Sequence, residues 1–308
     1  MNNQPVQIIG AGLAGLLAAH AWPNIPIIEE AARDDLVGHN ALLRFRGDAV
    51  SRLTGIPFRE VTVRKGIWFR NAYQPPSIDM ANRYSRKVLG RVVSDRSIWN
   101  VHAAQRFIAP EDFYERLIEY AGSRISWGEK YDFKGAPSVP TISTAPLPVV
   151  IKAIIGHEPK EEFARAPIIV QRYRIPQADV FQTIYFPDEG LPIYRASITG
   201  DLLIVESVFS AQIDVTDLRE LGSAFGMPVR KAELIDTVSQ KYGKIIPLPD
   251  NVRKDLLFKL TTQKGIYSLG RFAQWRNILL DDVVDDIAVI KRLLQSGSSY
   301  DAARVRAS

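Results

Sequence analysis

The chain has 308 residues, of which 46% are hydrophobic and 24% are charged, and this balance excludes wholesale disorder and a fibrous repeat. At about 150 residues per domain, the length predicts two domains, or one nucleotide-binding domain with a large insertion. Cysteine is absent, which excludes disulfides, thiolate metal sites and cysteine nucleophiles. The first apolar run is interrupted by glycines and has no Lys or Arg before it. We therefore expect a soluble, cytoplasmic protein without a signal peptide or a membrane span.

The basic residues gather in one segment. Between residues 44 and 106 there are thirteen Lys or Arg against four Asp or Glu, so this segment carries +9 while the rest of the chain sums to −4. Two interpretations stay open. The segment is either a solvated basic surface, whose arginine stems cover apolar area, or a site that faces an anion such as a cofactor diphosphate, a phosphorylated substrate or nucleic acid. Aromatic residues interleave with these charges, as base stacking would require; they are Trp68, Tyr73, Tyr84 and Trp99.

The chain opens with the pattern strand, glycine turn, helix, strand. Residues 6–9 form an apolar run that ends at a glycine, residues 13–21 are rich in Ala and Leu, and residues 25–28 form a second apolar run that ends in two glutamates. This order predicts a βαβ unit with two parallel strands.

The remaining elements alternate at first and then change period. We expect, in chain order, a helix over 110–122, strands over 124–127 and 139–147, extended segments over 167–210, a helix over 231–242, a strand over 256–269 and a helix over 281–294. The period of two over 167–210 predicts an antiparallel sheet in a second layer. The last helix has one apolar stripe at helical spacing, formed by Val283, Ile287, Ile290 and Leu294.

These elements predict an α/β protein with two domains, each built from separate parts of the chain. The first, with Rossmann-like topology, comprises residues 1–60, 100–150 and 245–300. The second, a substrate domain on the antiparallel sheet, comprises residues 61–99 and 151–244. Residues 301–308 are expected to form a frayed tail.

The opening turn is a G-x-G-x-x-G motif placed after a strand and before a helix, which is the context of a dinucleotide-binding site. Gly10 permits a tight turn, Gly12 lets the backbone approach a diphosphate, and Gly15 allows close packing of helix and strand. Glu29, at the end of the second strand, is placed to accept a hydrogen bond from a ribose hydroxyl, and Glu30 is the alternative. The motif predicts a dinucleotide without choosing between NAD and FAD.

Three further segments resemble known flavoproteins. Gly38-His39-Asn40, which leads to Arg44, resembles the second glycine turn of glutathione-reductase-type FAD proteins. Residues 267–277 resemble the terminal Gly-Arg block of UDP-galactopyranose mutases and of the flavin amine oxidase superfamily. Residues 143–146 resemble the crossing strand of that family.

The resemblance implies a non-covalently bound FAD, and no cysteine is available for a thioether tether. The residues that it assigns to the cofactor are Gly10, Gly12, Leu13, Ala14, Gly15, Glu29, Glu30, Gly38, His39, Asn40, Arg44, Thr144, Gly270, Arg271, Trp275 and Asn277.

Residues 38–46, 55–59 and 65–68 together look like compact FAD-dependent oxidoreductases of tailed bacteriophages. Some flavoenzymes of that kind act in thymidine hypermodification, where they cleave an amino acid appended to a DNA base. The resemblance implies an oxidoreductase or lyase that acts at a C–N bond of an amine or an amino-acid-decorated substrate, in the host cytoplasm. The catalytic candidates are Tyr194, Arg195, Lys65 and Trp68, with Arg195 as a bidentate clamp for an anionic substrate.

Other functions stay open. One is a redox-neutral flavin enzyme on a nucleotide sugar, as in the mutases, and another is a nucleic-acid-binding protein with a structural dinucleotide. No metal is predicted, because the four histidines are scattered and the paired aspartates near residue 281 complement the dipole of a helix start. No G-x-S-x-G sequence is present for serine hydrolase chemistry.

Overall fold

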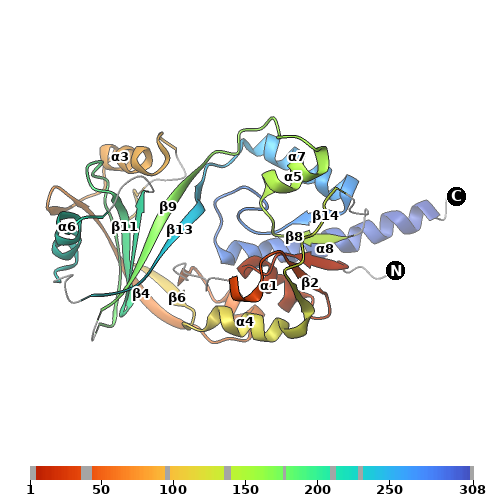
Figure 1. The fold of residues 1–308 in the computed structure, drawn as a ribbon, viewed down its shortest axis with the longest axis horizontal. Helices are drawn as coiled ribbons and strands as arrows, with labels where there is room; N and C mark the ends of the chain where they lie inside the picture. Colours follow the sequence, from red (N-terminus) through yellow and green to blue (C-terminus); the bar gives the residue numbers. More distant parts are fainter. Residues whose placement is uncertain are drawn as a thin grey trace.

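The computed structural model describes residues 5–35, 44–93, 98–134, 140–175, 178–208, 213–227 and 232–305, with side chains up to residue 296. Its two parts lie end to end along the long axis (Figure 1), one on a five-stranded parallel sheet and the other on a nine-stranded, mainly antiparallel sheet. The predicted fold class is therefore confirmed. In the described part of the chain, no helix combines the length and the apolar character needed to cross a bilayer.

Five short strands from distant parts of the chain form the parallel sheet, in the order β14-β8-β1-β2-β7. Their bounds are Gln7–Ile9 for β1, Ile27–Glu29 for β2, Ile125–Trp127 for β7, Thr141–Ser143 for β8 and Ile266–Ser268 for β14. The predicted opening unit is confirmed, because β1, helix α1 (Leu13–Ala21) and β2 follow one another and β1 pairs with β2 in parallel. The carboxyl ends of parallel strands share one edge, which is where such sheets bind ligands.

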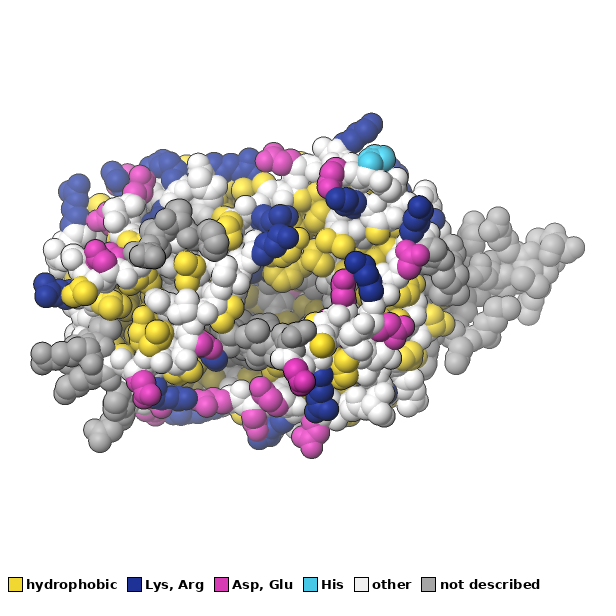
Figure 2. Space-filling model, in the orientation of Figure 1, with side chains coloured by type: hydrophobic (Ala, Val, Ile, Leu, Met, Phe, Trp, Pro, Cys, Tyr) yellow, Lys and Arg dark blue, Asp and Glu magenta, His cyan; other side chains and the backbone are white. Residues whose placement is uncertain are grey.

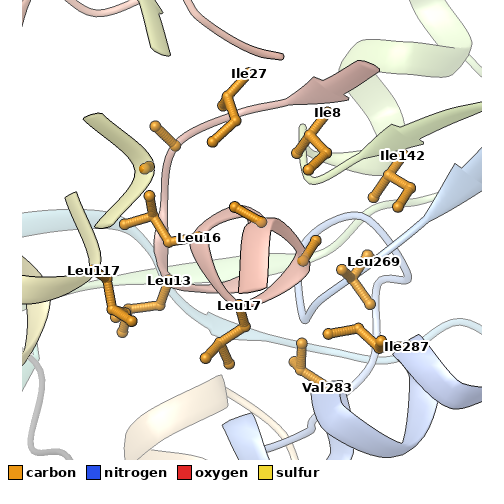
Figure 3. Close-up of a cluster of buried hydrophobic side chains, with 14 of the residues drawn as sticks. Ile8, Leu13, Leu16, Leu17, Ile27, Leu117, Ile142, Leu269, Val283 and Ile287 are labelled. Atoms are coloured by element: carbon orange, nitrogen blue, oxygen red, sulfur yellow. The ribbon is translucent and has the colours of Figure 1, made fainter. Parts of the chain in front are cut away.

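Helix α1 lies at the centre of the first hydrophobic core. Leu16 and Leu17 are fully buried, and Figure 3 shows them between isoleucines of the sheet and apolar residues of the last helix. The helices around α1 are α2 (Ala49–Thr54), α4 (Phe113–Ala121) and α8 (Leu280–Val305). Burial of each such leucine stabilises the fold by roughly 1.5–3 kcal/mol. The predicted stripe of the last helix is confirmed, since all four of its residues are buried.

The nine-stranded sheet has the order β13-β9-β12-β11-β10-β4-β6-β3, and β5 pairs with β4. The bounds are Arg44–Phe45 for β3, Arg59–Phe69 for β4, Ala72–Gln74 for β5, Ala104–Ile108 for β6, Arg165–Arg174 for β9, Val180–Tyr185 for β10, Ile193–Gly200 for β11, Leu202–Val208 for β12 and Glu233–Ile245 for β13. Its neighbours are antiparallel except for β10 and β4. The antiparallel sheet expected over 167–210 is thus present and extends well beyond those residues.

This sheet curls back on itself. β3 is three strands away from β10, which at about 4.8 Å per strand would place them about 14 Å apart in a flat sheet. Arg44 of β3 nevertheless donates hydrogen bonds to Thr183 of β10 and to Thr199 of β11. We call the inner side of the curl the concave face; it carries Arg44, Lys65, Thr183, Arg195 and Glu206, as the strand registers require.

One helix packs on each face of the sheet. Helix α3 (Ile78–Leu89) covers part of the concave face, where the Tyr84 ring contacts Tyr194 edge-on. Helix α6 (Val215–Phe225) covers the opposite face and buries Leu221 against it. Figure 1 shows these two helices at the end of the molecule away from α5, α7 and α8.

Two predicted elements are wrong in type. Residues 231–242 were expected to be helical, but strand β13 runs from Glu233 to Ile245 and pairs with β9 along its length. The apolar spacing of this segment fits either a helix or a strand, and the hydrogen bonds to β9 favour the strand. Residues 256–269 were expected to form a strand. They mostly lie in helix α7 (Asp250–Lys264), which begins after Pro249 and ends at Gly265 with φ +64°.

Two predicted boundaries also differ. The apolar run expected as a strand over 139–147 is a three-residue strand, β8, followed by helix α5 (Leu147–Ile155), which has a proline in its first turn. Helix α8 continues to Val305, past the predicted end at residue 294.

A buried lysine joins α3 to the sheet. The Lys87 amine donates to the carbonyl oxygens of Phe186 at 2.8 Å and Ile193 at 2.6 Å. Burial lowers the pKa of Lys87 from 10.5 to about 7, against the opposing effect of nearby acids. The amine therefore loses its proton in the folded chain at a lower pH than in the unfolded chain.

This shift has a testable consequence for stability. Between about pH 7 and 10.5 the unfolded chain binds the proton that the folded chain has released, so the Lys87 contribution to the unfolding free energy rises with pH. The slope should approach about 1.4 kcal/mol per pH unit. Chemical denaturation of the wild type and of Lys87→Met across this range measures the difference. Parallel pH profiles for the two proteins would contradict the lowered pKa.

Candidate functional site

The glycine turn lies where the carboxyl ends of β1, β2 and β8 meet. A Cβ atom at Gly10 would lie 2.2 Å from the Thr144 hydroxyl oxygen, and one at Gly15 would lie 1.9 Å from the Gly10 carbonyl oxygen. A Cβ at Gly12 would meet no heavy atom within 4 Å. Packing inside the protein therefore requires the first and third glycines, whereas the middle glycine borders open space.

Of the two acids at the end of β2, only Glu29 turns toward the glycine turn. Its carboxylate accepts hydrogen bonds from the backbone N–H groups of Ala11 at 2.6 Å and Ala31 at 2.9 Å. Glu30 instead points outward and pairs with the exposed Lys130 at 3.2 Å. The structure thus places Glu29, and not Glu30, at the edge where a ribose is expected.

Three residues near this edge were not among the predicted site residues. The Tyr114 hydroxyl donates to the Ala11 carbonyl oxygen at 3.2 Å, and burial, with the charge of Glu29, raises the pKa of Tyr114 to about 12. Tyr114 lines a cavity of about 670 Å³ together with Arg33 and Trp127. Trp127 pairs in register with Glu29. A prediction that β7 lies beside β2 would therefore have placed Trp127 at this edge.

The C-terminal block lies against the first turn of α1. Gly270 has φ +93°, and a Cβ there would lie 2.8 Å from the Ala14 Cβ atom. The next residue, Arg271, donates to the Gly243 carbonyl oxygen at 3.2 Å, and its guanidinium lies 5.5 Å from the centroid of the Phe272 ring. Thr144 also lies against Gly10. Four distant segments therefore meet at the glycine turn: the end of β2, helix α4, the residues after β8 and the C-terminal block.

Further positions assigned to the cofactor are Trp275, Asn277 and the predicted second glycine turn. Trp275 is fully buried, donates from its indole nitrogen to the Ile246 carbonyl at 3.1 Å and packs edge-on against Phe163, so its visible role is in the core. Asn277 is half-buried after the same block. The predicted second glycine turn, formed by Gly38, His39 and Asn40, lies outside the described residues.

Arg44, which the resemblance assigned to the cofactor, directs its side chain onto the second sheet. Its strand, β3, pairs with β6, and strand alternation therefore directs the side chain onto the concave face. There it donates to the hydroxyl of Thr183 at 2.7 Å and of Thr199 at 2.6 Å and to the Ile198 carbonyl. Burial, and then the charge of Arg195, lower the pKa of Arg44 to about 9.

Tyr194 and Arg195 lie together on the concave face because the pairing of β11 with β12 shifts by one residue at this point. The Arg195 guanidinium binds both carboxylate oxygens of Glu206, one of them at 2.7 Å. The Lys244 amine lies 3.8 Å from the same carboxylate and 4.9 Å from the centroid of the Tyr194 ring. The Glu206 carboxylate therefore already binds the Arg195 guanidinium, which was expected to bind an anionic substrate.

The charge state of Glu206 follows from this cluster. Burial alone would raise the pKa of Glu206, but Arg195 and Lys244 outweigh it and lower the pKa to about 2. The carboxylate is ionised at neutral pH and holds two cations in place.

The four catalytic candidates are not all on one face. Lys65 pairs in register with Thr183 and lies on the concave face with Tyr194 and Arg195. Trp68 lies three residues after Lys65 on β4, so its side chain points to the opposite face of the sheet. There its indole nitrogen donates to the Glu220 carboxylate of α6 at 2.6 Å. The structure thus brings three candidates together and separates Trp68 from them.

Replacing Glu206 with Gln should lower the unfolding free energy at pH 7 by about 3–5 kcal/mol, because two cations lose their buried partner. The folded pKa of about 2 lies below the ordinary 4.5, so the Glu206 contribution is present above pH 4.5 and is lost as the pH falls toward 2. Denaturant titrations at several pH values should show the two proteins converging in acid. A constant difference down to pH 2 would contradict this account.

Comparison with protein-family models and with curated protein sequences finds no match. Solved structures do share the fold. One is a reduced UDP-galactopyranose mutase, with a TM-score of 0.63 and 15% identity over 95% of this chain and 96% of that one. A CLA-producing fatty acid isomerase from P. acnes has a TM-score of 0.59 and 11% identity over 95% and 99% of the two chains. An oxidoreductase from Methanosarcina mazei has a TM-score of 0.54 and 11% identity over 92% and 99%.

Proposed function

We propose that the chain is an FAD-dependent oxidoreductase that holds FAD non-covalently at the glycine turn. The observation that carries this proposal is the open space beside Gly12, in a turn whose other two glycines are packed against Thr144 and the backbone. A backbone that is exposed at one glycine and closely packed at its neighbours suits a bound diphosphate. Glu29 at the end of β2 and the Gly270–Arg271 block beside α1 support the same ligand.

Each described segment would hold one part of the cofactor. The Glu29 carboxylate would accept a hydrogen bond from a ribose hydroxyl of the cofactor. The cavity lined by Tyr114 and Trp127 would hold the adenosine end of FAD. The backbone at Gly12 and the start of α1 would face the diphosphate, with Arg271 as a neighbouring cation.

When bound, the flavin would supply the capacity to accept a hydride from a carbon that bears a nitrogen. The chain's own residues would bind and orient the substrate on the concave face, where Lys65 and Tyr194 lie. Glu206 would keep Arg195 fixed there as a positive charge.

For the substrate we propose an amine or an amino-acid-decorated compound, of which a modified thymidine base in phage DNA is one form. The resemblance of residues 38–46, 55–59 and 65–68 to phage oxidoreductases supports this choice. A base in a duplex would have to be flipped out before it could react. The second candidate is a redox-neutral reaction on a nucleotide sugar, which the fold shared with a UDP-galactopyranose mutase favours.

Gly12→Val should fold normally and purify without yellow colour. The position has an extended backbone and open space, so the protein tolerates a side chain, but that side chain would occupy the place of the diphosphate. Absorbance near the flavin bands and a thermal melt of the apoprotein measure the two effects. Gly190→Val, at an exposed turn, is the control and should stay yellow. A colourless wild type that binds NADH would contradict the choice of FAD.

Arg271→Ala should release flavin, whereas Arg276→Ala should mainly lower stability. Arg276 pairs with the largely buried Asp286 at 2.6 Å, so its loss removes an ion pair of the fold. Arg271 donates to a backbone carbonyl and lies against the Phe272 ring, and its charge would serve the diphosphate. Flavin titration and denaturant unfolding of each apoprotein separate the two effects. Equal flavin affinity in both variants would remove Arg271 from the site.

The two substrate classes are separated by how the flavin must be prepared. Anaerobic mixing of the oxidised protein with candidate amines should bleach the flavin if the first candidate holds. Ring isomerisation of a nucleotide sugar that requires prior reduction of the flavin would favour the second.

A further inference from the structure

The structure separates the basic segment, residues 44–106, into surface charges and a small inner group. Five of its thirteen cations form ion pairs at the surface. The face shown in Figure 2 has basic and acidic side chains intermixed over the outside of the molecule. The surface pairs are Arg46 with Asp282, Arg52 with Asp48, Arg59 with Asp179, Arg83 with Asp79 and Arg86 with Glu189. For these residues the interpretation as a solvated surface holds.

Three cations of the segment converge instead on the concave face. Arg44 comes from β3, Lys65 from β4 and Arg106 from β6, and these strands are neighbours at one end of the curled sheet. Lys65 pairs with Thr183, to which Arg44 donates a hydrogen bond. Arg106 pairs with Val61, which lies on the same side of β4 as Lys65 because they are four residues apart.

In the part of the chain that the structure describes, no acidic side chain forms an ion pair with any of these three cations. Arg44 directs its donors to neutral oxygens only, the hydroxyls of two threonines and backbone carbonyls. Within the described residues, Lys65 and Arg106 have no ion pair, and the carboxylate of Glu206 is already held by two other cations. Burial and the charge of Arg106 lower the pKa of Lys65, as expected for cations that crowd without a counter-ion.

We propose that Arg44, Lys65 and Arg106 form a binding site for a phosphate group of the substrate. This inference rests on the proposed function for its setting and adds the chemical class of the ligand. Arg44 acts as a fixed charge on the floor of the site, since each of its three guanidinium nitrogens already donates within the protein. Lys65 and Arg106 supply the donors that contact the anion, and the paired hydroxyls of Thr183 and Ser197, 2.9 Å apart, lie beside them.

A phosphate fits this site better than a carboxylate does. Three cations exceed the single charge of a carboxylate, while a phosphate monoester carries nearly two charges and three strong acceptor oxygens. A small ligand also fits better than duplex DNA, because Arg44 lies largely buried inside the curl between β3, β10 and β11. The phosphates of a duplex lie on a convex surface and would meet the outer cations instead, five of which are already paired with acids.

The test is titration calorimetry of the purified protein with inorganic pyrophosphate. Lys65→Gln and Arg106→Gln should each weaken binding by about tenfold or more, the range of a lost charge-assisted hydrogen bond. Arg86→Gln removes the same charge from the same segment but at the exposed surface of α3, and it should change the dissociation constant by less than about twofold. Arg44 is left unchanged in this comparison because its side chain also holds the curl together.

The possible outcomes separate this inference from the proposed function. Equal weakening in Arg86→Gln, or unchanged binding in Lys65→Gln and Arg106→Gln, overturns the site. A short DNA duplex that displaces pyrophosphate, with the same dependence on Lys65 and Arg106, overturns the assignment to a small ligand. Binding that is lost in Gly12→Val but kept in Lys65→Gln assigns the anion to the glycine turn and also overturns the site. A protein that purifies without flavin, yet loses pyrophosphate binding in both variants, refutes the proposed function and supports the phosphate site.

Discussion

The close approach of backbones at the glycine turn is the constraint on which the first half of the molecule depends. A single methyl group at Gly15 would lie 1.9 Å from the Gly10 carbonyl oxygen, so α1 can reach its position over β1 only with glycine there. That position in turn brings Leu16 and Leu17 into the core. It also aligns the start of the helix with the open space at Gly12. The same packing that stabilises the core therefore produces the ligand-binding edge.

Local chemistry explains which predictions from the sequence succeeded. The glycine spacing, the two apolar runs and the stripe on the last helix are set by neighbours within a few turns of chain, and the structure has them where they were expected. The residues 231–242 show the opposite case. Their apolar spacing fits a helix or a strand, and the hydrogen bonds of β9, some sixty residues earlier, decide for a strand. A pattern within one segment contains no information about such a distant partner.

The candidate site shows the same division. Gly10, Gly12, Gly15 and Glu29 lie together because one βαβ unit positions them all. The side chains of the second sheet could not be assigned from sequence, because their position depends on strand parity and on the curl. Lys65 and Trp68 are three residues apart and therefore lie on opposite faces of one strand. Arg44 reaches β10 and β11 only because the sheet closes on itself, which no local signal predicts.

The net charge of a segment likewise does not say where its charges point. Part of the excess of thirteen cations over four acids is offset by ion pairs with acids elsewhere in the chain, namely Asp179, Glu189 and Asp282. What the folded structure adds is one buried acid, Glu206, placed so that it holds Arg195 and Lys244. With that acid engaged, Arg44, Lys65 and Arg106 retain their positive charge on the inside of the curl. The sign of this face is therefore set by the pairing of Glu206, and an anion is the ligand that the remaining charges can stabilise.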